Sequence, residues 1–209
     1  MSWLDLIIAR IEPVRLVARL KERRDTAALV RLLRRGDPST RHLAASALGE
    51  LGDPAALNAL LDALAGPDTE GVRWRAAEGL ALLGELAAPG LVVLAEDSDP
   101  DIRWKAIVAL GDIGDPRAAP VLCERLADPD RFVRGRAVSA LARLGRQCLP
   151  FMLDALANPD PRIRQGAAEV LGLLGDTAAV EELLRALQDP TESVRRAAAV
   201  ALLRINPAD

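Results

Sequence analysis

The stretch "VRWRAAEGLALLG" at positions 72–84 returns in altered form as "IRWKAIVALGDIG" at positions 102–114. Both place an apolar residue, an arginine, a tryptophan, a base and an alanine in the same order. The arginine of this pattern recurs at intervals of 32, 30, 31, 30 and 31 residues, as Arg41, Arg73, Arg103, Arg134, Arg164 and Arg195. The chain is therefore built from repeats, and the repeat decides the fold.

Each repeat predicts a pair of helices. An alanine stands three residues after every recurring arginine, a leucine stands seven residues after it, and a glycine stands eleven residues after it in five of the six copies. The apolar positions make one helical face, and the glycine suits a left-handed helix end, a role that Asn206 takes in the last copy. An aspartate then caps a second, leucine-rich helix. Each unit is thus an αα-hairpin, and no alternating strand pattern occurs.

The motif "D-P-x-x-V-R-x-x-A-A-x-A-L-G-x-L-G-D" followed by a leucine-rich helix resembles HEAT repeats. It is most similar to the short HEAT-like subclass of phycobilisome lyases and designed alphaRep proteins, and the resemblance covers residues 13–206. The resemblance implies an all-α fold, a right-handed α-solenoid or superhelix of about six to seven HEAT-like repeats. Such a fold serves many partners, so the resemblance says much more about fold than about function.

We expect one repeat domain over residues 1–209. Residues 1–36 are expected to form a capping helix and a degenerate repeat, residues 37–189 the regular repeats, and residues 190–209 a C-terminal half repeat. Residues 3–11 form an apolar stretch that is broken from the next helix at Pro13. Covering the first repeat is the favoured role of that stretch, with dimerisation or membrane contact as alternatives.

The composition favours a soluble, cytoplasmic protein. Hydrophobic residues make up 50% of the chain, charged residues 27%, and the net charge is −3, so no global field attracts nucleic acid or membrane. Cys123 and Cys148 lie 25 residues apart without metal-ligand spacing, which is typical of a reduced compartment. No signal peptide and no membrane-spanning run is expected.

The Arg-containing helices are expected to line the concave side, because their small residues let neighbouring helices approach closely. Positions +1, +2, +5 and +9 after each recurring arginine, together with the turn position −2 that holds Phe132, should then be exposed on that side. Three of the five aromatic residues fall on this face with bases beside them. The candidate partner-binding residues are Trp74, Arg75, Glu78, Trp104, Lys105, Asp112, Phe132, Arg136 and Arg143. The alternative is that the two tryptophans only fill the groove between adjacent helices.

The recurring arginine marks the architecture, because it appears in every regular copy. The HEAT resemblance implies that such arginines pair with loop acids in a ladder, a role that matches Asp53, Asp115 and Asp176. Arg146 departs from the pattern, so the ladder is expected to weaken near residue 145.

No catalytic constellation is apparent. The chain has a single histidine, His42, and the iron-binding HEAT-repeat deoxyhypusine hydroxylases carry His-Glu pairs that this sequence lacks, so they are excluded as a model. Cys123 is expected in the core and Cys148 to be more exposed, with no histidine beside it as a base. No cofactor and no metal is expected.

We therefore expect a non-enzymatic scaffold or protein–protein interaction module that binds a peptide or a partner helix in its concave groove. The alternative is a bilin-attachment or chromophore-handling factor, which the resemblance to phycobilisome lyases implies. A HEAT-like DNA glycosylase or DNA binder is the third and least favoured hypothesis, because acids interrupt the bases of the groove.

Overall fold

A computed structural model describes residues 12–69 and 71–206, and over these residues the fold is all-α with no strand. This confirms the fold class that the repeat predicts. The helix expected over residues 3–11 lies outside the described residues. No helix within the described ranges is long and apolar enough to cross a membrane.

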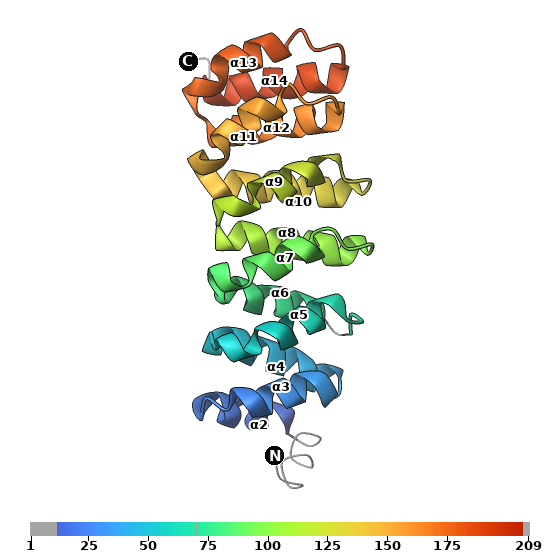
Figure 1. The fold of residues 1–209 in the computed structure, drawn as a ribbon, viewed down its shortest axis with the longest axis vertical. Helices are drawn as coiled ribbons and strands as arrows, with labels where there is room; N and C mark the ends of the chain where they lie inside the picture. Colours follow the sequence, from blue (N-terminus) through green and yellow to red (C-terminus); the bar gives the residue numbers. More distant parts are fainter. Residues whose placement is uncertain (1–11, 70, 207–209) are drawn as a thin grey trace. The chain divides into compact units, whose positions relative to one another are not determined.

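The helices follow one another as hairpins (Figure 1). The pairs are α2 (Pro13–Glu22) with α3 (Thr26–Arg35), α4 (Pro38–Leu51) with α5 (Leu57–Ala65), α6 (Val72–Leu82) with α7 (Ala88–Leu94), α8 (Pro100–Ile113) with α9 (Ala119–Glu124), α10 (Arg131–Leu144) with α11 (Leu149–Ala155), and α12 (Pro161–Leu174) with α13 (Val180–Ala186). The last described helix is α14 (Glu192–Ile205). Every recurring arginine lies in the first helix of its hairpin or, for Arg195, in α14.

The chain forms two compact units, Met1–Ala109 and Leu110–Asp209, and each is described by itself. In the first unit, α4 packs against α2, α3 and α6. In the second, α12 packs against α10, α11 and α14. The alanine and leucine columns of the repeat form the core, since all six alanines at +3 and the first five leucines at +7 have no solvent exposure.

The turns within the hairpins follow the predicted chemistry. The five glycines at +11 have φ between +64° and +73°, a conformation that costs other residues steric strain. Asp53, Asp115 and Asp176 then cap the following helical turn, each accepting a hydrogen bond from a backbone N–H two residues on. Asn206 was expected to share the glycine conformation, but its φ is −128°, so that prediction is wrong.

Neighbouring Arg-containing helices touch through their backbones at two glycines of the second unit. A Cβ atom added to Gly111 would lie 2.8 Å from the Cα of Ala140, and one added to Gly172 would lie 2.7 Å from the Cα of Ala201. Both glycines stand at +8 and both alanines at +6 of the next repeat. These contacts set the separation of α8 from α10 and of α12 from α14, because no side chain fits between them.

This close approach predicts opposite effects for two Gly→Ala substitutions. Gly172→Ala should lower the free energy of unfolding by about 1–3 kcal/mol, because the new methyl group meets backbone that cannot yield. Gly135→Ala, in the interior of α10, meets nothing within 4 Å. It should stabilise the chain by about 0.5–1 kcal/mol through helix propensity alone. Urea denaturation of both variants measures the two effects, and an unchanged or raised stability for Gly172→Ala would contradict the contact.

Candidate functional site

Trp74 and Trp104 lie against one another in the first unit. Trp74 comes from α6 and Trp104 from the same repeat position on α8, so the 30-residue spacing brings them side by side. Their ring centroids are 5.5 Å apart and their planes are tilted by 31°, an arrangement that aromatic pairs favour. Both side chains are half-buried. The pair therefore packs between helices and still presents aromatic surface to solvent.

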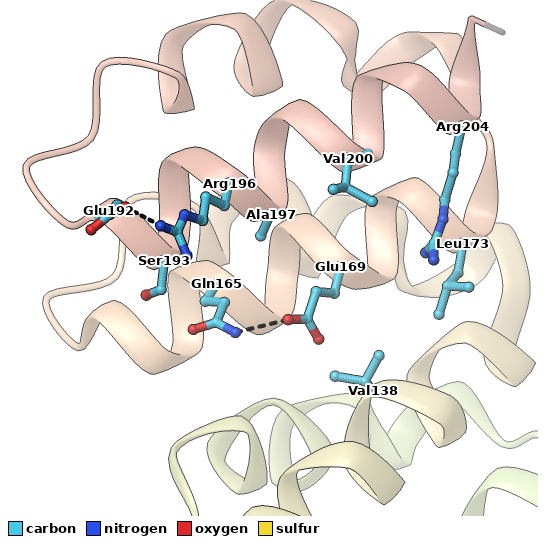
Figure 2. Close-up of a pocket in the computed structure, with 11 residues that line it drawn as sticks. Val138, Gln165, Glu169, Leu173, Glu192, Ser193, Arg196, Ala197, Val200 and Arg204 are labelled. Carbon is cyan, nitrogen blue, oxygen red and sulfur yellow. Dashed lines mark hydrogen bonds and ion pairs between the residues drawn. The ribbon is translucent and has the colours of Figure 1, made fainter.

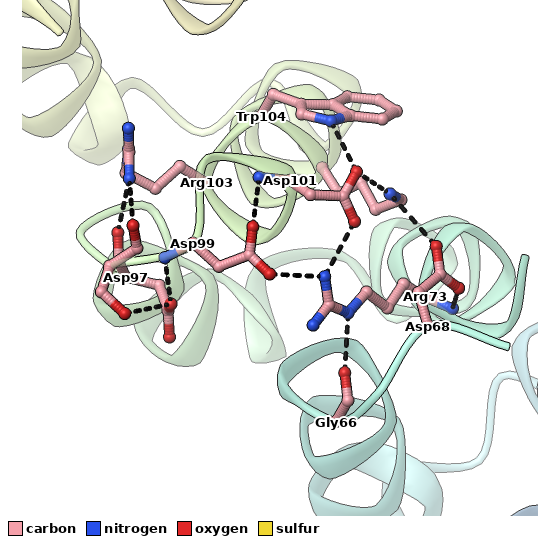
Figure 3. Close-up of polar contacts among 10 residues, drawn as sticks. Gly66, Asp68, Arg73, Asp97, Asp99, Asp101, Arg103 and Trp104 are labelled. Atoms are coloured by element: carbon pink, nitrogen blue, oxygen red, sulfur yellow. Dashed lines mark hydrogen bonds and ion pairs between the residues drawn. The ribbon is translucent and has the colours of Figure 1, made fainter. Parts of the chain in front are cut away.

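A polar network holds the Trp104 ring in place (Figure 3). The Trp104 indole N–H donates a hydrogen bond of 2.9 Å to the carboxylate of Asp101. That carboxylate also accepts a bond of 2.9 Å from the Arg73 guanidinium, which donates at 2.8 Å to Asp99 as well. Asp101 thus ties an aromatic residue of the candidate surface to a scaffold arginine.

The charges of this network lower the pKa of both carboxyl groups. Burial raises the pKa of Asp101, but hydrogen bonds from Lys105 and Arg73 outweigh the burial and hold it below its ordinary value. The backbone N–H of Asp101 lowers the pKa of Asp99, and the Arg73 guanidinium lowers it further. Both groups are therefore carboxylates over a wider pH range than in an unfolded chain.

Lys105 does not lie where the sequence predicts. It was expected as an exposed base, but it is only 4% exposed. Its ammonium pairs with Asp101, lies 3.6 Å from Asp68, and sits 4.5 Å from the centroid of the Trp104 ring. The Lys105 side chain faces Asp68 in the turn of the preceding repeat instead of solvent, so Lys105 supports Trp104 and offers no exposed cation.

Arg75 links two helices of the first unit. Its guanidinium donates a bond of 3.1 Å to His42 of α4 and a bond of 2.8 Å to Glu78 of α6. The side chains of Arg75 and Glu78 are 38% and 42% exposed, so both remain accessible to a ligand beside the tryptophans.

The other candidate residues are grouped in the second unit. Phe132 is 48% exposed and the Arg136 guanidinium lies 4.5 Å from its ring centroid. Arg143 forms an ion pair with Asp112. The expected residues thus fall into the Trp74–Trp104 group in one unit and these two pairs in the other, and whether they bind a partner stays a prediction.

The recurring arginines are structural, and two of them pair with loop acids as expected, Arg73 with Asp99 and Asp101, and Arg164 with Asp189. These acids are not Asp53, Asp115 and Asp176, which were the expected partners. Arg134 donates bonds of 2.8 and 3.2 Å to the backbone carbonyls of Asp128 and Pro129, in the turn before its own helix. Arg103 and Arg195 make the equivalent pairs of bonds. These arginines therefore cap the turn between repeats.

The ladder acids were wrongly assigned because they lie at the opposite end of the helix. Each recurring arginine stands near the helix N-terminus, whereas Asp53, Asp115 and Asp176 follow the C-terminus. Asp176 instead pairs at 2.6 Å with Arg146, the residue where the ladder was expected to weaken.

A hollow of about 680 Å³ in the second unit was missed (Figure 2). Its lining includes positions +1, +5 and +9 of α12 and α14, which are Gln165, Glu169, Leu173, Arg196, Val200 and Arg204. These positions belong to the columns that the sequence predicts to be exposed. The candidate residues were chosen for their aromatic side chains, so these columns were passed over, although the repeat pattern already predicted them to be exposed.

The two cysteines are poor nucleophiles. Cys148 was expected to be more exposed, but it is fully buried and its thiol donates to the carbonyls of Leu141 and Gly145. Burial raises the pKa of Cys148 to about 11, and burial also raises the pKa of Cys123. At neutral pH the reactive thiolate form of Cys148 is therefore scarce.

The described residues do not fit a protein-bound metal. No group of three or more His, Cys, Asp or Glu side chains suited to a metal ion occurs in residues 12–69 and 71–206. His42, the one histidine of the sequence, accepts a hydrogen bond from Arg75.

Tandem αα-hairpins with buried alanine and leucine columns and an arginine-capped turn define an α-helical repeat protein. A family model described as HEAT repeats matches residues 7–81, 68–142 and 122–204. The chain belongs to the HEAT repeat family.

Curated relatives include enzymes of two kinds. The chain is 29% identical to deoxyhypusine hydroxylase of Eremothecium gossypii over 78% of this chain and 61% of that protein, so it spans about three fifths of the relative's length. It is 33% identical to phycocyanobilin lyase subunit alpha of Picosynechococcus sp., over 55% of this chain and 50% of that protein. A solved structure of the CpcE–CpcF complex of phycocyanin lyase from Nostoc sp. PCC7120 is similar with 25% identity and a TM-score of 0.51, covering 71% of this chain and 99% of that one.

These relatives correct two expectations. A non-enzymatic interaction module is contradicted, because the matching proteins are named as enzymes, among them deoxyhypusine hydroxylases of Eremothecium gossypii and Bos taurus. The exclusion of the hydroxylases as a model was also too strong, since the similarity is present where the His-Glu pairs are not. The absence of metal-ligand side chains concerns the chemistry of a site. It does not show whether the repeats are related.

Acid should weaken the first unit through Asp99 and Asp101. Their pKa values are lower in the folded chain than the unfolded value of about 4, so they stabilise the fold above that pH and lose this effect as the pH falls through the folded values. Asp101→Asn should cost about 1–2 kcal/mol at pH 7 and flatten the loss of stability between about pH 5 and pH 2. Urea unfolding followed by tryptophan fluorescence measures both effects.

Asp154→Asn is the matched control, because Asp154 is exposed and has no ion pair within the described part of the chain. It should retain the wild-type stability at pH 7. An undiminished acid dependence in Asp101→Asn would show that the network around Trp104 is not its source.

Proposed function

We propose that this chain is a component of a bilin-handling enzyme, comparable to a phycocyanobilin lyase subunit, and that the surface around Trp74 and Trp104 binds the tetrapyrrole. The carrying observation is the 33% identity to phycocyanobilin lyase subunit alpha, supported by the similarity to the CpcE–CpcF complex at a TM-score of 0.51. A role as a component of an enzyme also agrees with the relatives of the chain, which are named as enzymes.

The geometry of the tryptophan pair supports a flat, conjugated ligand. Two half-buried indole rings at 5.5 Å supply apolar surface on which a tetrapyrrole ring can stack. Arg75 lies one residue after Trp74, and its partly exposed guanidinium can pair with a propionate of the bilin. The network of Asp101, Lys105 and Arg73 would keep Trp104 in its orientation before the ligand arrives.

In this proposal the chain holds the bilin without a covalent bond. A bilin is attached to protein through a thiolate, whereas Cys148 is buried, Cys123 is half-buried, and burial raises the pKa of both thiols. The acceptor thiol would belong to another protein. The proposed contacts to such a partner protein are two pairs of residues. One is Phe132 with Arg136, and the other is Arg143 with Asp112.

The hydroxylase relatives do not supply a better proposal. Their similarity covers more of this chain, at 78% for the Eremothecium gossypii enzyme, but the described side chains offer no iron ligand set. No reaction step through a bound metal is therefore derived for this chain.

Titration with phycocyanobilin tests the proposed function. The wild type should shift the absorbance of the bilin and quench tryptophan fluorescence, and Trp74→Ala/Trp104→Ala should weaken binding by about tenfold or more, because truncating aromatic anchors typically costs at least about 2 kcal/mol. Denaturation should release all of the bilin. Phe151→Ala is the control, because it removes an aromatic side chain that is 43% exposed on α11 and should bind like the wild type.

The titration is repeated with the Nostoc CpcF subunit added, since the similar lyase structure is a two-subunit complex. Absence of any shift or quenching in both series would reject the proposal. Equal binding by the double variant would reject the tryptophan surface as the site.

A further inference from the structure

The hollow of the second unit runs along two parallel rows of side chains (Figure 2). Residues four apart on a helix lie one above the other, about 6 Å along the axis. Gln165, Glu169 and Leu173 make the row on α12, and Arg196, Val200 and Arg204 make the row on α14. The close contact of Gly172 with Ala201 joins the two helices beneath these rows.

One end of the hollow is apolar. Leu173 and Val200 are 51% and 49% exposed, although both are large hydrophobic residues. Val138 of α10 points toward them from the opposite side. Exposed apolar side chains that gather around a hollow of this kind favour a ligand with an apolar body.

Arg204, a cation with no partner among the described residues, stands at the same end. Arg204 extends from α14 toward Leu173, and it has no hydrogen bond or ion pair to any residue of the described ranges 12–69 and 71–206. Arg196, at the other end of the row, is already paired with Glu192. The hollow therefore has one guanidinium available for an anion, next to its apolar walls.

An acidic side chain limits how much negative charge the hollow accepts. Glu169 lies one turn before Leu173, and one of its oxygens accepts a bond of 2.8 Å from the Gln165 amide. The dashed bond in Figure 2 places this carboxylate between the two ends of the hollow. A ligand with a second negative charge near Glu169 would be repelled.

We propose that this hollow binds a small apolar molecule with a single carboxylate. The carboxylate pairs with Arg204, the apolar body packs on Leu173, Val200 and Val138, and Glu169 disfavours dianions. The volume of about 680 Å³ falls within the roughly 300–1,000 Å³ of small-molecule sites. The site lies wholly in the second unit and goes beyond the proposed bilin surface, on which it does not depend.

Methyl NMR of the whole chain with three probes tests the site. The probes are 4-phenylbutyrate, the uncharged 4-phenylbutan-1-ol with nearly the same apolar body, and the dianion phenylsuccinate. We expect saturable shifts of the Val138, Leu173 and Val200 methyl signals, with the monocarboxylate binding about tenfold more tightly than the alcohol, since hydrogen bonds between charged groups are stronger than neutral ones. Phenylsuccinate should bind more weakly than 4-phenylbutyrate.

Two variants and a control assign the roles. Arg204→Gln should lower the affinity for 4-phenylbutyrate to that for the alcohol, and Glu169→Gln should raise the affinity for phenylsuccinate. Arg185→Gln should change neither, because Arg185 is an equally exposed arginine on α13 that pairs with Glu181. Circular dichroism checks that each variant is folded.

The proposal is overturned if 4-phenylbutyrate gives no saturable shift at these methyl groups. It is also overturned if the alcohol binds as tightly as the acid, or if Arg204→Gln leaves the preference for the acid unchanged. Each of these outcomes is independent of bilin binding at Trp74 and Trp104, so failure here leaves the proposed function standing.

Discussion

The backbone contact between neighbouring Arg-containing helices is the constraint on which the rest of each unit depends. A glycine at +8 meets an alanine at +6 of the next helix where Gly111 touches Ala140 and Gly172 touches Ala201. Gly49 meets Gly79 in the same way in the first unit. Because nothing larger fits, these contacts fix which columns face inward and which are left at the surface. The buried alanines at +3 and leucines at +7 follow from that spacing.

Two surface features of this chain lie at the junctions without such a glycine. Between α6 and α8, position +8 is Ala81, and the Trp74–Trp104 pair occupies the +1 column of that junction. Between α10 and α12, position +8 is Ala142 and position +6 is Val170, and a second hollow of about 230 Å³ opens beside Gly135 and Gln165. The Trp74–Trp104 pair and this smaller hollow thus lie at junctions without a glycine contact, whereas the larger hollow of about 680 Å³ lies over the close Gly172–Ala201 contact between α12 and α14.

The sequence predicted what is encoded locally and missed what depends on distant turns. The repeat length, the helix pairs, the glycine turns and the aspartate caps each arise within a few residues, so periodicity was enough to place them. Lys105 was misplaced because its partner Asp68 lies 37 positions earlier, in a turn whose approach no local pattern reveals. The acids of the arginine ladder were misassigned for a related reason, since the resemblance supplied the kind of partner, as Arg164 with Asp189 shows, but not the end of the helix at which it lies. The hollow beside Arg204 needed the packing of α12 on α14, although its lining columns were already known.

The residue positions that show membership of the family differ from those that can hold a ligand, because the two sets occupy different columns of the repeat. The family match extends over residues 7–204, the same span as the alanine, leucine and glycine columns that pack one helix on the next. Positions +1, +5 and +9 take little part in that packing, so they are free to hold tryptophan, arginine, glutamate or glycine without loss of the fold. A relative can therefore be named as an enzyme, and this chain can share its scaffold while its own surface columns carry an aromatic pair and an arginine-lined hollow. We therefore expect a ligand of such a chain to be held by those columns, because they are the part of the repeat that the fold does not already use.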